Sequence, residues 1–422
     1  MRKVFIYLFI IGVTLTAGAG AREDIKHNVC LSANNYLAYP DQNLPALTPA
    51  PEGYTPFFID HYARHGSRWL ISPSDYNYPV EVLAQAEQAG CLTKLGKEAL
   101  EVARQMQEAS RGRLGELTEI GAEQHRGIAR RMAEHYPAVF QGEGASVDAR
   151  STTVIRCILS MQNEVNELQA RFPQLRTTMD ASVHDMRYMN FRDSVGYAAK
   201  DLGAPAVKEL YDRMLKPDAF LKRLFTSKEF IAQVDGKRLM RKLFKLASNA
   251  QGHKQFKDTN LYRLFTDNEI YDIWRYNNAW WYVHGGDSPL TRGRVPFVQA
   301  NLLRDFIQEA DEAVMTDRHG ASMRFGHETM VLSLAALMGL DDAGYRTTDL
   351  QTLDRHWQSY KIFPMACNIQ LIFYRNGQGH VLVKALLNEH EATLPLTAVT
   401  GPYYAWSDVR EYFMHRLSEQ QP

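Results

Sequence analysis

The sequence has no net charge, few cysteines and no long apolar stretch beyond its first residues. It holds 48 Lys plus Arg against 48 Asp plus Glu in 422 residues. A neutral chain gives no general electrostatic reason to bind nucleic acid or an anionic membrane, although it leaves room for a local basic pocket. Four cysteines without a C-x-x-C pair give no support for a zinc or redox centre. The sequence also lacks an internal repeat and a low-complexity tract, so a repeat architecture is excluded.

Length and composition predict a large folded protein. A hydrophobic fraction of 45% with 11% aromatic residues argues against disorder. The length exceeds the roughly 250–300 residues that one hydrophobic core supports. We therefore expect either two domains or a core that carries a large insertion.

The one apolar run, residues 4–17, follows Arg2 and Lys3 and ends before two small-x-small cleavage patterns at residues 17–21. The run is shorter than the about 20 residues of a comfortable transmembrane helix. It therefore predicts a signal peptide over residues 1–21, with an uncleaved membrane anchor as the alternative. The mature chain would be periplasmic or extracellular, without a stable membrane anchor. Its net charge would be −2, because cleavage removes two bases and no acid.

Export permits disulfides, but Cys30, Cys91, Cys157 and Cys367 allow three full pairings and nothing in their spacing selects one. Cys157 lies in an apolar helical stretch, which favours a small core residue over a reactive thiol.

The order of elements predicts an α/β fold. The run PFFIDHYARHG, residues 56–66, is typical of a buried strand that enters a loop. Helices are expected over residues 81–110, 115–136, 151–170 and 328–339, and strands over residues 145–150 and 322–325. Residues 369–374 and 381–387 predict a hairpin. Residues 200–280 are mainly helical and rich in Lys and Arg. We expect a doubly wound, mostly parallel sheet with helices on both faces, formed by residues 50–165 and 290–415, with a helical cap inserted at residues 166–289.

The first chemical motif is Arg64-His65-Gly66-Ser67-Arg68, at the predicted carboxyl end of the first strand, where ligands bind in open α/β sheets. Guanidinium groups suit phosphate because they offer a rigid donor fork. Nearby cations would lower the pKa of His65 and favour a neutral, nucleophilic imidazole. The glycine would let the backbone approach a ligand. The alternative is a surface loop that is merely basic.

The second motif, Gly326-His327-Glu328-Thr329, follows a predicted strand and opens a helix. A helix N-terminus offers free N–H groups and positive potential to an anion. His327 could bind a phosphate oxygen there, and Glu328 could protonate a leaving alkoxide. Helix capping is the alternative reading of this pair.

Together with Arg156-Cys157-Ile158-Leu159-Ser160, an R-x-x-x-S pattern, these motifs resemble the histidine phosphatase superfamily. The similar branch is that of histidine acid phosphatases, phytases and multiple inositol polyphosphate phosphatases, and the R-C-x-x-S form is most similar to the last of these. The resemblance covers residues 50–415.

The resemblance implies a two-step reaction. His65 would attack phosphorus, Arg64, Arg68, Arg156 and His327 would hold the other phosphate oxygens, and Glu328 would donate the proton. The clustered cations could stabilise phosphoryl transfer without a metal or other cofactor, and no acidic cluster has the spacing of a magnesium site. The similar enzymes carry His-Asp or His-Ala-Glu where this chain has His-Glu-Thr, so Glu328 is one methylene longer than the usual aspartate.

Further residues bear on the substrate. Arg187 and His61 are candidate substrate contacts, although His61 fits a buried, hydrogen-bonded histidine equally well. The cap carries a basic set that suits a polyphosphorylated ligand or a solvated helix face: Lys222, Arg223, Lys237, Arg238, Arg241, Lys242 and Lys245. The aromatic run at residues 277–282 could form a platform for a sugar-like ring or part of the cap core.

We therefore expect an exported phosphomonoesterase that acts on inositol polyphosphates such as phytate, and that binds a small molecule and no nucleic acid. A broad acid phosphatase that acts on sugar phosphates is the nearer alternative. A catalytically silent phosphate-ligand binder is the alternative from another class, and a mutase of the same superfamily fits poorly with export.

Overall fold

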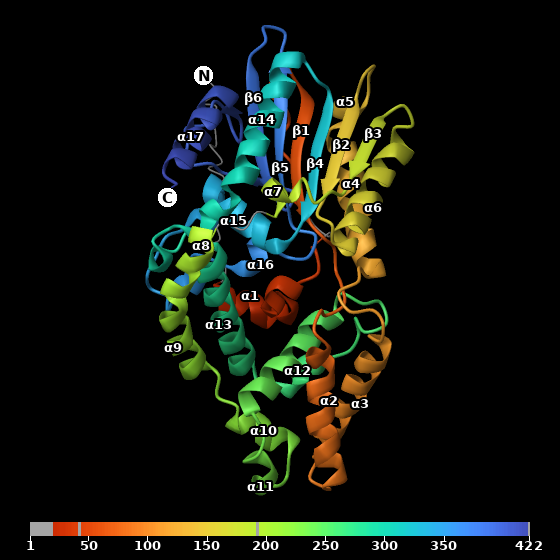
Figure 1. Ribbon diagram of the computed structural model, residues 1–422, viewed down its shortest axis with the longest axis vertical. Coiled ribbons are helices and arrows are strands. Elements are labelled where there is room, and N and C mark those ends of the chain that lie inside the picture. Colours follow the sequence, from red (N-terminus) through yellow and green to blue (C-terminus); the bar gives the residue numbers. More distant parts are fainter. Residues whose placement is uncertain (1–19, 41–43, 191–193, 421–422) are drawn as a thin grey trace, which may run out of the picture.

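The computed structural model describes residues 20–40, 44–190 and 194–420 of the chain. Figure 1 shows a sheet flanked by helices in the upper half and a second body of helices below it. Residues 1–19 of the predicted signal peptide lie outside the described residues, and Ala21 begins the first described helix. Among the described residues, no helix combines the length and the apolar composition that a bilayer span requires.

The sheet is mixed, with a parallel half and an antiparallel half. Its strand order is β3-β2-β4-β1-β5-β6-β7, and β8 pairs with β6. Pairing is parallel from β3 to β1 and antiparallel from β1 to β7. The strands are β1 (Tyr54–Arg64), β2 (Ser146–Ser151), β3 (Arg176–Asp180), β4 (Gly320–Gly326), β5 (Asn368–Asn376), β6 (Val381–Leu387), β7 (His390–Ala392) and β8 (Tyr404–Ala405). The predicted α/β class is confirmed, and so is the hairpin, formed by β5 and β6.

Helices cover both faces of the sheet, and β1 shows why. Its side chains alternate between the two faces, so Ile59 and Ala63 pack with the helices of one side, and Phe58 and Tyr62 with those of the other. One side carries α4 (Glu119–His135), α5 (Pro137–Phe140) and α6 (Ile155–Arg171). The other carries α14 (Ala300–Thr316), α15 (Glu328–Met338) and α17 (Trp406–Ser418).

The lower body has its own hydrophobic core. The main helices of this core are α2 (Pro73–Gln88), α3 (Lys94–Ala109), α10 (Asp218–Leu224), α12 (Gly236–Ala250) and the first half of α13 (Asp267–Gly285). We call these the cap helices. Because α2 and α3 precede residue 166 and strand β3 follows it, the two bodies interleave along the chain. The division at residues 165/166 and 289/290 stays a prediction.

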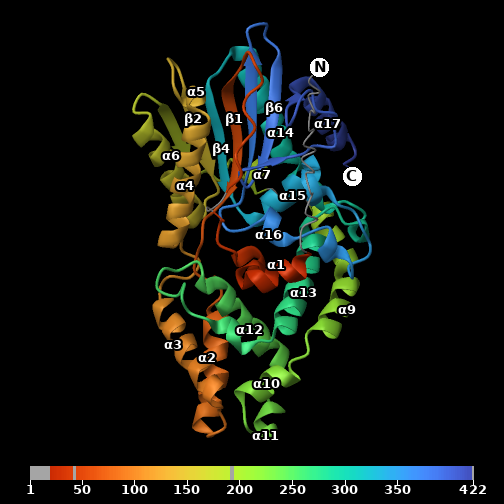
Figure 2. The same cartoon turned by 180° about the vertical axis from the view of Figure 1, so that it is seen from behind.

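A short N-terminal stretch lies between the two bodies, as Figure 2 shows from behind. It consists of helix α1 (Ala21–His27) and the 3-10 helix η1 (Val29–Tyr36). The remaining helices are α7 (Met186–Met189), α8 (Ser194–Ala199), α9 (Ala204–Met214), α11 (Lys228–Ile231) and α16 (Ser359–Ile362). The 3-10 helices that follow η1 are η2 (Lys200–Gly203), η3 (Leu261–Leu264), η4 (Pro289–Thr291), η5 (Val295–Gln299), η6 (Asp341–Gly344) and η7 (Leu353–Arg355).

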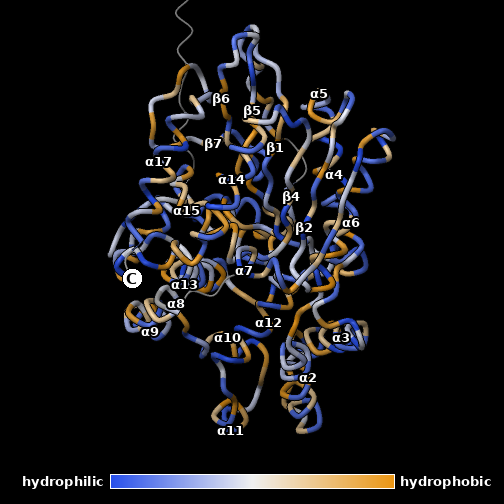
Figure 3. The backbone as a smooth tube through the Cα atoms, turned by 45° about the horizontal axis from the view of Figure 1, so that its top comes forward, coloured by the Kyte–Doolittle hydropathy of each residue, from blue (hydrophilic) through white to orange (hydrophobic). Residues whose placement is uncertain are grey.

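Most expected helices form where their caps and apolar positions placed them. The side chain of Thr118 accepts a hydrogen bond from Gly121 N and so begins α4. The single helix expected at residues 81–110 is wrong, because Gly90 adopts a φ of 68° and separates α2 from α3. Along helices such as α3 and α6, the tube in Figure 3 alternates between hydrophobic and hydrophilic colours, as expected for helices with one buried face.

Candidate active site

Two neighbouring strands bring the two sequence motifs together. Strand β1 ends at Arg64 and β4 ends at Gly326, and these two residues are partners in the parallel ladder. His65 N donates to Gly326 O at 3.0 Å, so the chain continues from β1 directly beside the second motif. Both motifs therefore lie at the carboxyl edge of the parallel half of the sheet, where ligands bind in open α/β folds.

His65 has one ring nitrogen tethered and the other free. Its Nδ1 lies 2.9 Å from Gly66 O. A carbonyl oxygen only accepts hydrogen bonds, so Nδ1 carries the ring proton and donates it to this oxygen. Its Nε2 is buried and has no hydrogen-bond partner among the described residues. Burial, followed by the charges of Arg64, Arg156 and Arg68, lowers the pKa of His65 well below its usual range. The imidazole is therefore neutral and presents the lone pair of Nε2 to the site.

The loop after His65 is held by helices α4 and α6. Gly66 N donates to Ser160 Oγ at 3.1 Å, and Ser67 N donates to Gln124 Oε1 at 2.8 Å. A Cβ on Gly66 would lie 2.3 Å from Gly121 O. The expectation that Gly66 leaves room for a ligand is therefore corrected: that space is filled by the backbone of α4. Ser160 is the last residue of the R-x-x-x-S pattern, so the pattern links α6 to this loop.

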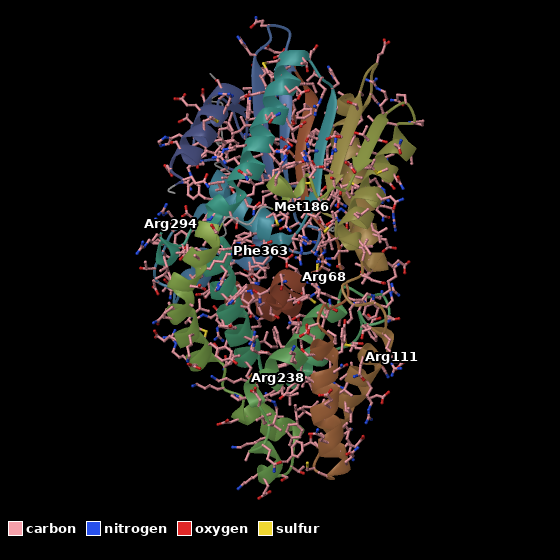
Figure 4. All side chains as sticks on the ribbon, viewed as in Figure 1. Arg68, Arg111, Met186, Arg238, Arg294 and Phe363 are labelled. Atoms are coloured by element: carbon pink, nitrogen blue, oxygen red, sulfur yellow. The ribbon has the colours of Figure 1, made fainter. Side chains whose placement is uncertain are left out.

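Three arginines surround His65. Arg64 is fully buried, and its Nη1 donates to Phe363 O at 3.2 Å and to Pro364 O at 3.1 Å. Arg68 is 4% exposed and lies over the ring of Tyr36 at 5.4 Å. Figure 4 places Arg68 and Phe363 at the level where the sheet meets the cap helices. Arg156 enters from the first turn of α6 and is half-buried.

His327 occupies the N-cap position of α15, and its ring centroid lies 5.6 Å from that of His65. Burial, with Arg156, Arg64 and Arg68, lowers the pKa of His327 to about 4 against the opposing charge of Glu328. His327 is thus a neutral hydrogen-bonding group at a helix N-terminus. Cys157 is fully buried beside it, and burial raises the pKa of its thiol to about 11. The burial of Cys157 agrees with its expected role as a small core residue. Cys30, Cys91, Cys157 and Cys367 are all free thiols.

Glu328 faces the same point as the two histidines. Burial favours its neutral form, but Arg64, Arg68 and His327 hold the pKa of Glu328 down to about 2. Its Oε2 lies 3.2 Å from Arg64 Nε, and its Oε1 accepts a hydrogen bond from Asn35 Nδ2 at 3.0 Å. In the resting site, Glu328 is therefore a carboxylate with one partner on each oxygen.

A metal could find ligands here, but the surrounding charge favours an anion. One ligand atom each of His65, His327 and Glu328 lies within 4.8 Å of the others. The three guanidinium groups that lower the pKa of both histidines would repel a dication at this point. The arrangement instead offers a convergent set of donors that suits a phosphate group.

The other two candidate contacts lie elsewhere. His61 is fully buried and its Nε2 lies 3.1 Å from Glu164 Oε1, so contact with a substrate is corrected in favour of a buried, paired histidine. Arg187 is exposed and stacks on the ring of Tyr188 at 5.1 Å. Its role toward the substrate stays a prediction.

A cavity of about 590 Å³ adjoins the site on the cap side. Asn35 and Tyr36, which contact Glu328 and Arg68, both line it. Four members of the predicted basic set also line it: Arg238, Arg241, Lys242 and Lys245. Figure 4 shows Arg238 among the cap helices below Arg68. From the aromatic run, Asn277, Trp280 and Trp281 line the cavity, whereas Tyr282 is buried in the core.

Three members of the basic set do not line the cavity. Lys222 is exposed, Arg223 pairs with Glu269, and Lys237 lies 3.1 Å from Asp212. Within the cavity, Lys242 and Lys245 share Asp75 as their acidic partner. The cavity thus holds two arginines whose guanidinium groups rest on aromatic rings, Arg238 over Tyr78 at 3.9 Å and Arg241 beside Tyr211 at 5.6 Å.

Sequence reasoning missed several residues that build the site. Asn35, Tyr36, Gln124 and Glu164 carry no motif of their own, and their side chains reach the site only through the tertiary fold. Ser160 is different, because the R-x-x-x-S pattern already singled it out in the sequence, and its side chain accepts the hydrogen bond from Gly66 N.

Comparisons with known proteins agree with this geometry. A family model described as the histidine phosphatase superfamily (branch 2) matches residues 63–388. No curated protein matches the sequence significantly.

Solved structures with a similar fold include two enzymes. The multiple inositol polyphosphate phosphatase of Bifidobacterium longum, crystallised with inositol hexasulfate, superposes with a TM-score of 0.70 at 20% identity, over 91% of this chain and 97% of that one. The phytase of D. castellii gives a TM-score of 0.67 at 14% identity, over 93% of this chain and 86% of that one. At these identities, the likeness establishes a shared fold.

Proposed function

Since the chain belongs to the histidine phosphatase superfamily (branch 2), we propose that it cleaves inositol polyphosphates such as phytate through a phosphohistidine at His65. Membership makes the chain a hydrolase that acts on phosphoric monoesters. The residue roles and the substrate are the proposal. The observation that carries it is the free Nε2 of His65, which is buried among three arginines.

In the first step, Nε2 of His65 attacks phosphorus and the bond from phosphorus to the ester oxygen breaks. The donor on Nδ1 remains tethered to Gly66 O, which keeps the ring oriented while positive charge develops on it. Arg64, Arg68 and Arg156 neutralise the charge on the non-bridging oxygens, and His327 donates a hydrogen bond to one of them.

Glu328 supplies the proton to the departing alkoxide and later takes one from water. Its pKa of about 2 makes it a carboxylate in the empty site, because Arg64 and Arg68 outweigh its burial. A bound phosphate neutralises those same arginines and so raises the pKa of Glu328. A monoester that binds as its monoanion carries the needed proton with it. In the second step, water attacks the phosphohistidine, the P–N bond breaks, and Glu328 accepts the proton of that water.

The cavity beside the site supports a polyphosphorylated substrate. Arg238 and Arg241 lie at its wall, supported by aromatic rings, and Lys242 and Lys245 add two more cations. When one phosphate occupies the arginines around His65, other phosphates of an inositol ring would find cations here. The inositol hexasulfate in the B. longum enzyme is a ligand of the same polyanionic class.

A broad acid phosphatase is the second candidate. Asp75 already pairs with Lys242 and Lys245, and Asp235 also lines the cavity, so part of its positive charge is compensated inside the protein. Such a cavity would also admit a sugar phosphate. A silent phosphate binder would require that Glu328 fail to reach the leaving oxygen.

Export is part of the proposal. The cationic start, the apolar run at residues 4–17 and the small residues at positions 17–21 support cleavage of a signal peptide and a periplasmic or extracellular location.

One assay tests the proposal. The purified mature protein and its His65→Ala variant are incubated with phytate and with 4-nitrophenyl phosphate. The pH is varied from about 3 to about 8, because the phosphate and carboxyl groups titrate in this range. We expect faster release from phytate by the wild type, no release by His65→Ala, and an acid-labile phosphohistidine in quenched wild-type reactions. Equal turnover of both esters would support the acid phosphatase. Phosphate-ester binding without release would support the silent binder, and full activity of His65→Ala would overturn the mechanism.

A further inference from the structure

The N-terminal segment, defined here as residues 21–39, lies between the sheet and the cap helices and is bonded to both (Figures 1 and 2). On the side of the sheet, Leu37 O accepts a hydrogen bond from Met365 N at 2.7 Å. On the side of the cap, Ala38 N donates to Gln251 Oε1 at 3.1 Å. The segment is therefore a fixed part of the wall between the two bodies.

Asn34 sets the direction of the chain at this point. It has a φ of 52°, which few residues other than glycine adopt, and it is 3% exposed. Its side chain compensates through two hydrogen bonds, from Ser359 Oγ at 2.8 Å and to Ser32 O at 3.1 Å. This anchored turn aims the next side chain, Asn35, at the active site.

We propose that Asn35 is a positioning residue that holds the carboxyl group of Glu328 in place for proton transfer to the leaving oxygen. The inference rests on the proposed phosphatase function. Asn35 Nδ2 donates to Oε1 of Glu328 at 3.0 Å, while Oε2 lies 3.2 Å from Arg64 Nε. The two oxygens are thus held from opposite sides, one by the N-terminal segment and one by β1.

Without Asn35, the carboxyl group has a competing position. Among the described residues, Arg64 Nε and Nη2 make no hydrogen bond, although Nε already lies 3.2 Å from Oε2 of Glu328. Together the two nitrogens form a fork that a carboxylate can occupy with both oxygens. Glu328 would then be withdrawn from the leaving oxygen, and Arg64 would lose donors that the phosphate needs. By holding Oε1, Asn35 keeps the pair from closing. A glutamate needs this restraint more than an aspartate, because its extra methylene adds a rotatable bond.

The charge around Glu328 shows how the pH profile should respond. The titratable and charged groups that interact with its carboxyl group lie on β1 and the loop after it, on α6, at the start of α15 and just before β5. They are Arg64, Arg68, Arg156, His327, Tyr62, Cys157 and Cys367. The hydrogen bond from Asn35 also lowers the pKa of Glu328. Removing this bond therefore raises that pKa, whereas the other groups are unchanged.

The test compares two leaving groups in the full mature chain. The alkoxide of phytate leaves poorly and needs a proton, whereas 4-nitrophenolate leaves without one. We expect Asn35→Ala to lower kcat for phytate about tenfold, a part of the 10²–10⁴ that general acid catalysis contributes. We expect the rate of 4-nitrophenolate release in a single turnover to change less than about twofold, since this first step needs no proton from Glu328. The alkaline limb of the kcat profile for phytate, which follows Glu328 in the complex with bound phosphate, should move to higher pH.

Two further variants separate positioning from general damage. Asn28→Ala is the matched control, because Asn28 lies on the same segment and its side chain accepts a hydrogen bond from Cys30 N, far from Glu328 in the chain. In a Glu328→Gln background the donor is already lost, so adding Asn35→Ala should lower phytate turnover no further.

The outcomes separate the two proposals. If wild-type protein cleaves neither ester, the proposed function fails and the role of Asn35 fails with it. If the wild type is active but Asn35→Ala slows both esters equally, matches Asn28→Ala, or adds its full effect to Glu328→Gln, only the positioning role is overturned.

Discussion

His61 Nε2 lies 3.1 Å from Glu164 Oε1, and neither side chain reaches solvent. The other oxygen of Glu164 lies 2.6 Å from His125 Nδ1, which is also fully buried. Burial opposes ionisation, but His61 and His125 hold the pKa of Glu164 down to about 2. One carboxylate thus joins β1, α4 and α6 directly behind the loop that carries His65. The position of the nucleophile depends on how this buried charge is satisfied.

Replacing Glu164 with Ala should destabilise the protein by about 3–5 kcal/mol, because it leaves two buried imidazoles without their partner. The midpoint of thermal unfolding, measured by circular dichroism, should fall accordingly. Glu167→Ala is the matched control on the same helix: Glu167 pairs with Arg130 and Arg171, which are 49% and 35% exposed. That surface network should cost at most about 1 kcal/mol. Equal effects of the two variants would contradict the role given to Glu164.

Acid should unfold the protein through the same group. The pKa of Glu164 in the folded state, about 2, is below its ordinary value of 4.5, so the unfolded chain binds more protons between these values. The stabilisation is therefore complete above pH 4.5 and is lost as the pH falls toward 2. We expect the unfolding midpoint of the wild type to drop steeply in this window. The drop should be shallower in Glu164→Gln, and a parallel drop in both proteins would argue against this origin.

Gly121 permits the close approach of α4 to the phosphate-binding loop. A Cβ at this position would lie 2.2 Å from Ser67 O and 2.7 Å from Ser67 N, so a backbone segment must move. We expect Gly121→Ala to cost about 1–3 kcal/mol, as overpacking does, and to lower kcat because the loop shifts. Gly377→Ala is the control, since no heavy atom lies within 4 Å of its added methyl group. Loss of activity without loss of stability would place the effect in the loop alone.

The sequence made the centre of the site predictable because each motif carries its own local signal. The apolar run before Arg64 is bounded by proline and glycine, and the His327–Glu328 pair stands between a strand and a helix. Their meeting at one edge follows from the parallel pairing of β1 with β4. The α/β class followed from the same alternation of strands and helices.

Asn35 and Glu164 could not be found in this way. Asn35 is one asparagine in a polar stretch, and it reaches Glu328 only because the N-terminal segment folds between the two bodies. Glu164 sits in a helix whose one other acid, Glu167, is partly exposed, and nothing in the neighbouring sequence distinguishes the buried carboxylate from the exposed one. The role of Gly66 was misread for a related reason: its neighbour, Gly121, belongs to another helix.

Arg156 should contribute to binding the phosphate although it is the least buried of the three arginines. Its Nη1 contacts Gly115 O at 3.4 Å, which leaves most of its fork free for a ligand. Arg156→Ala should lower kcat/KM by about 10²–10³, as loss of one stabilising donor does, and Arg156→Lys should recover part of it because it keeps the charge without the fork. Arg171→Ala, at the far end of α6, is the control. Normal inhibition by inorganic phosphate in Arg156→Ala would contradict this contact.

The pH dependence of activity should reflect the ionisation of both Glu328 and the substrate. Because the pKa of Glu328 in the empty site is about 2, the enzyme holds no proton on this group at neutral pH, and the monoanionic ester must bring it. A phosphate monoester loses its second proton near pH 6, roughly as phosphoserine does. For phytate, kcat/KM should therefore fall as the pH rises through this value. For 4-nitrophenyl phosphate kcat should stay level, since its leaving group needs no proton. His65 stays neutral on the acid side of both profiles, because burial and the arginines lower its pKa.

Stopped assays of phosphate release at constant ionic strength measure both profiles. Glu328→Gln should lower kcat for phytate and leave the first turnover of 4-nitrophenyl phosphate nearly unchanged, because that step needs no proton from Glu328. A phytate rate that rises above pH 6 would contradict proton delivery by the substrate.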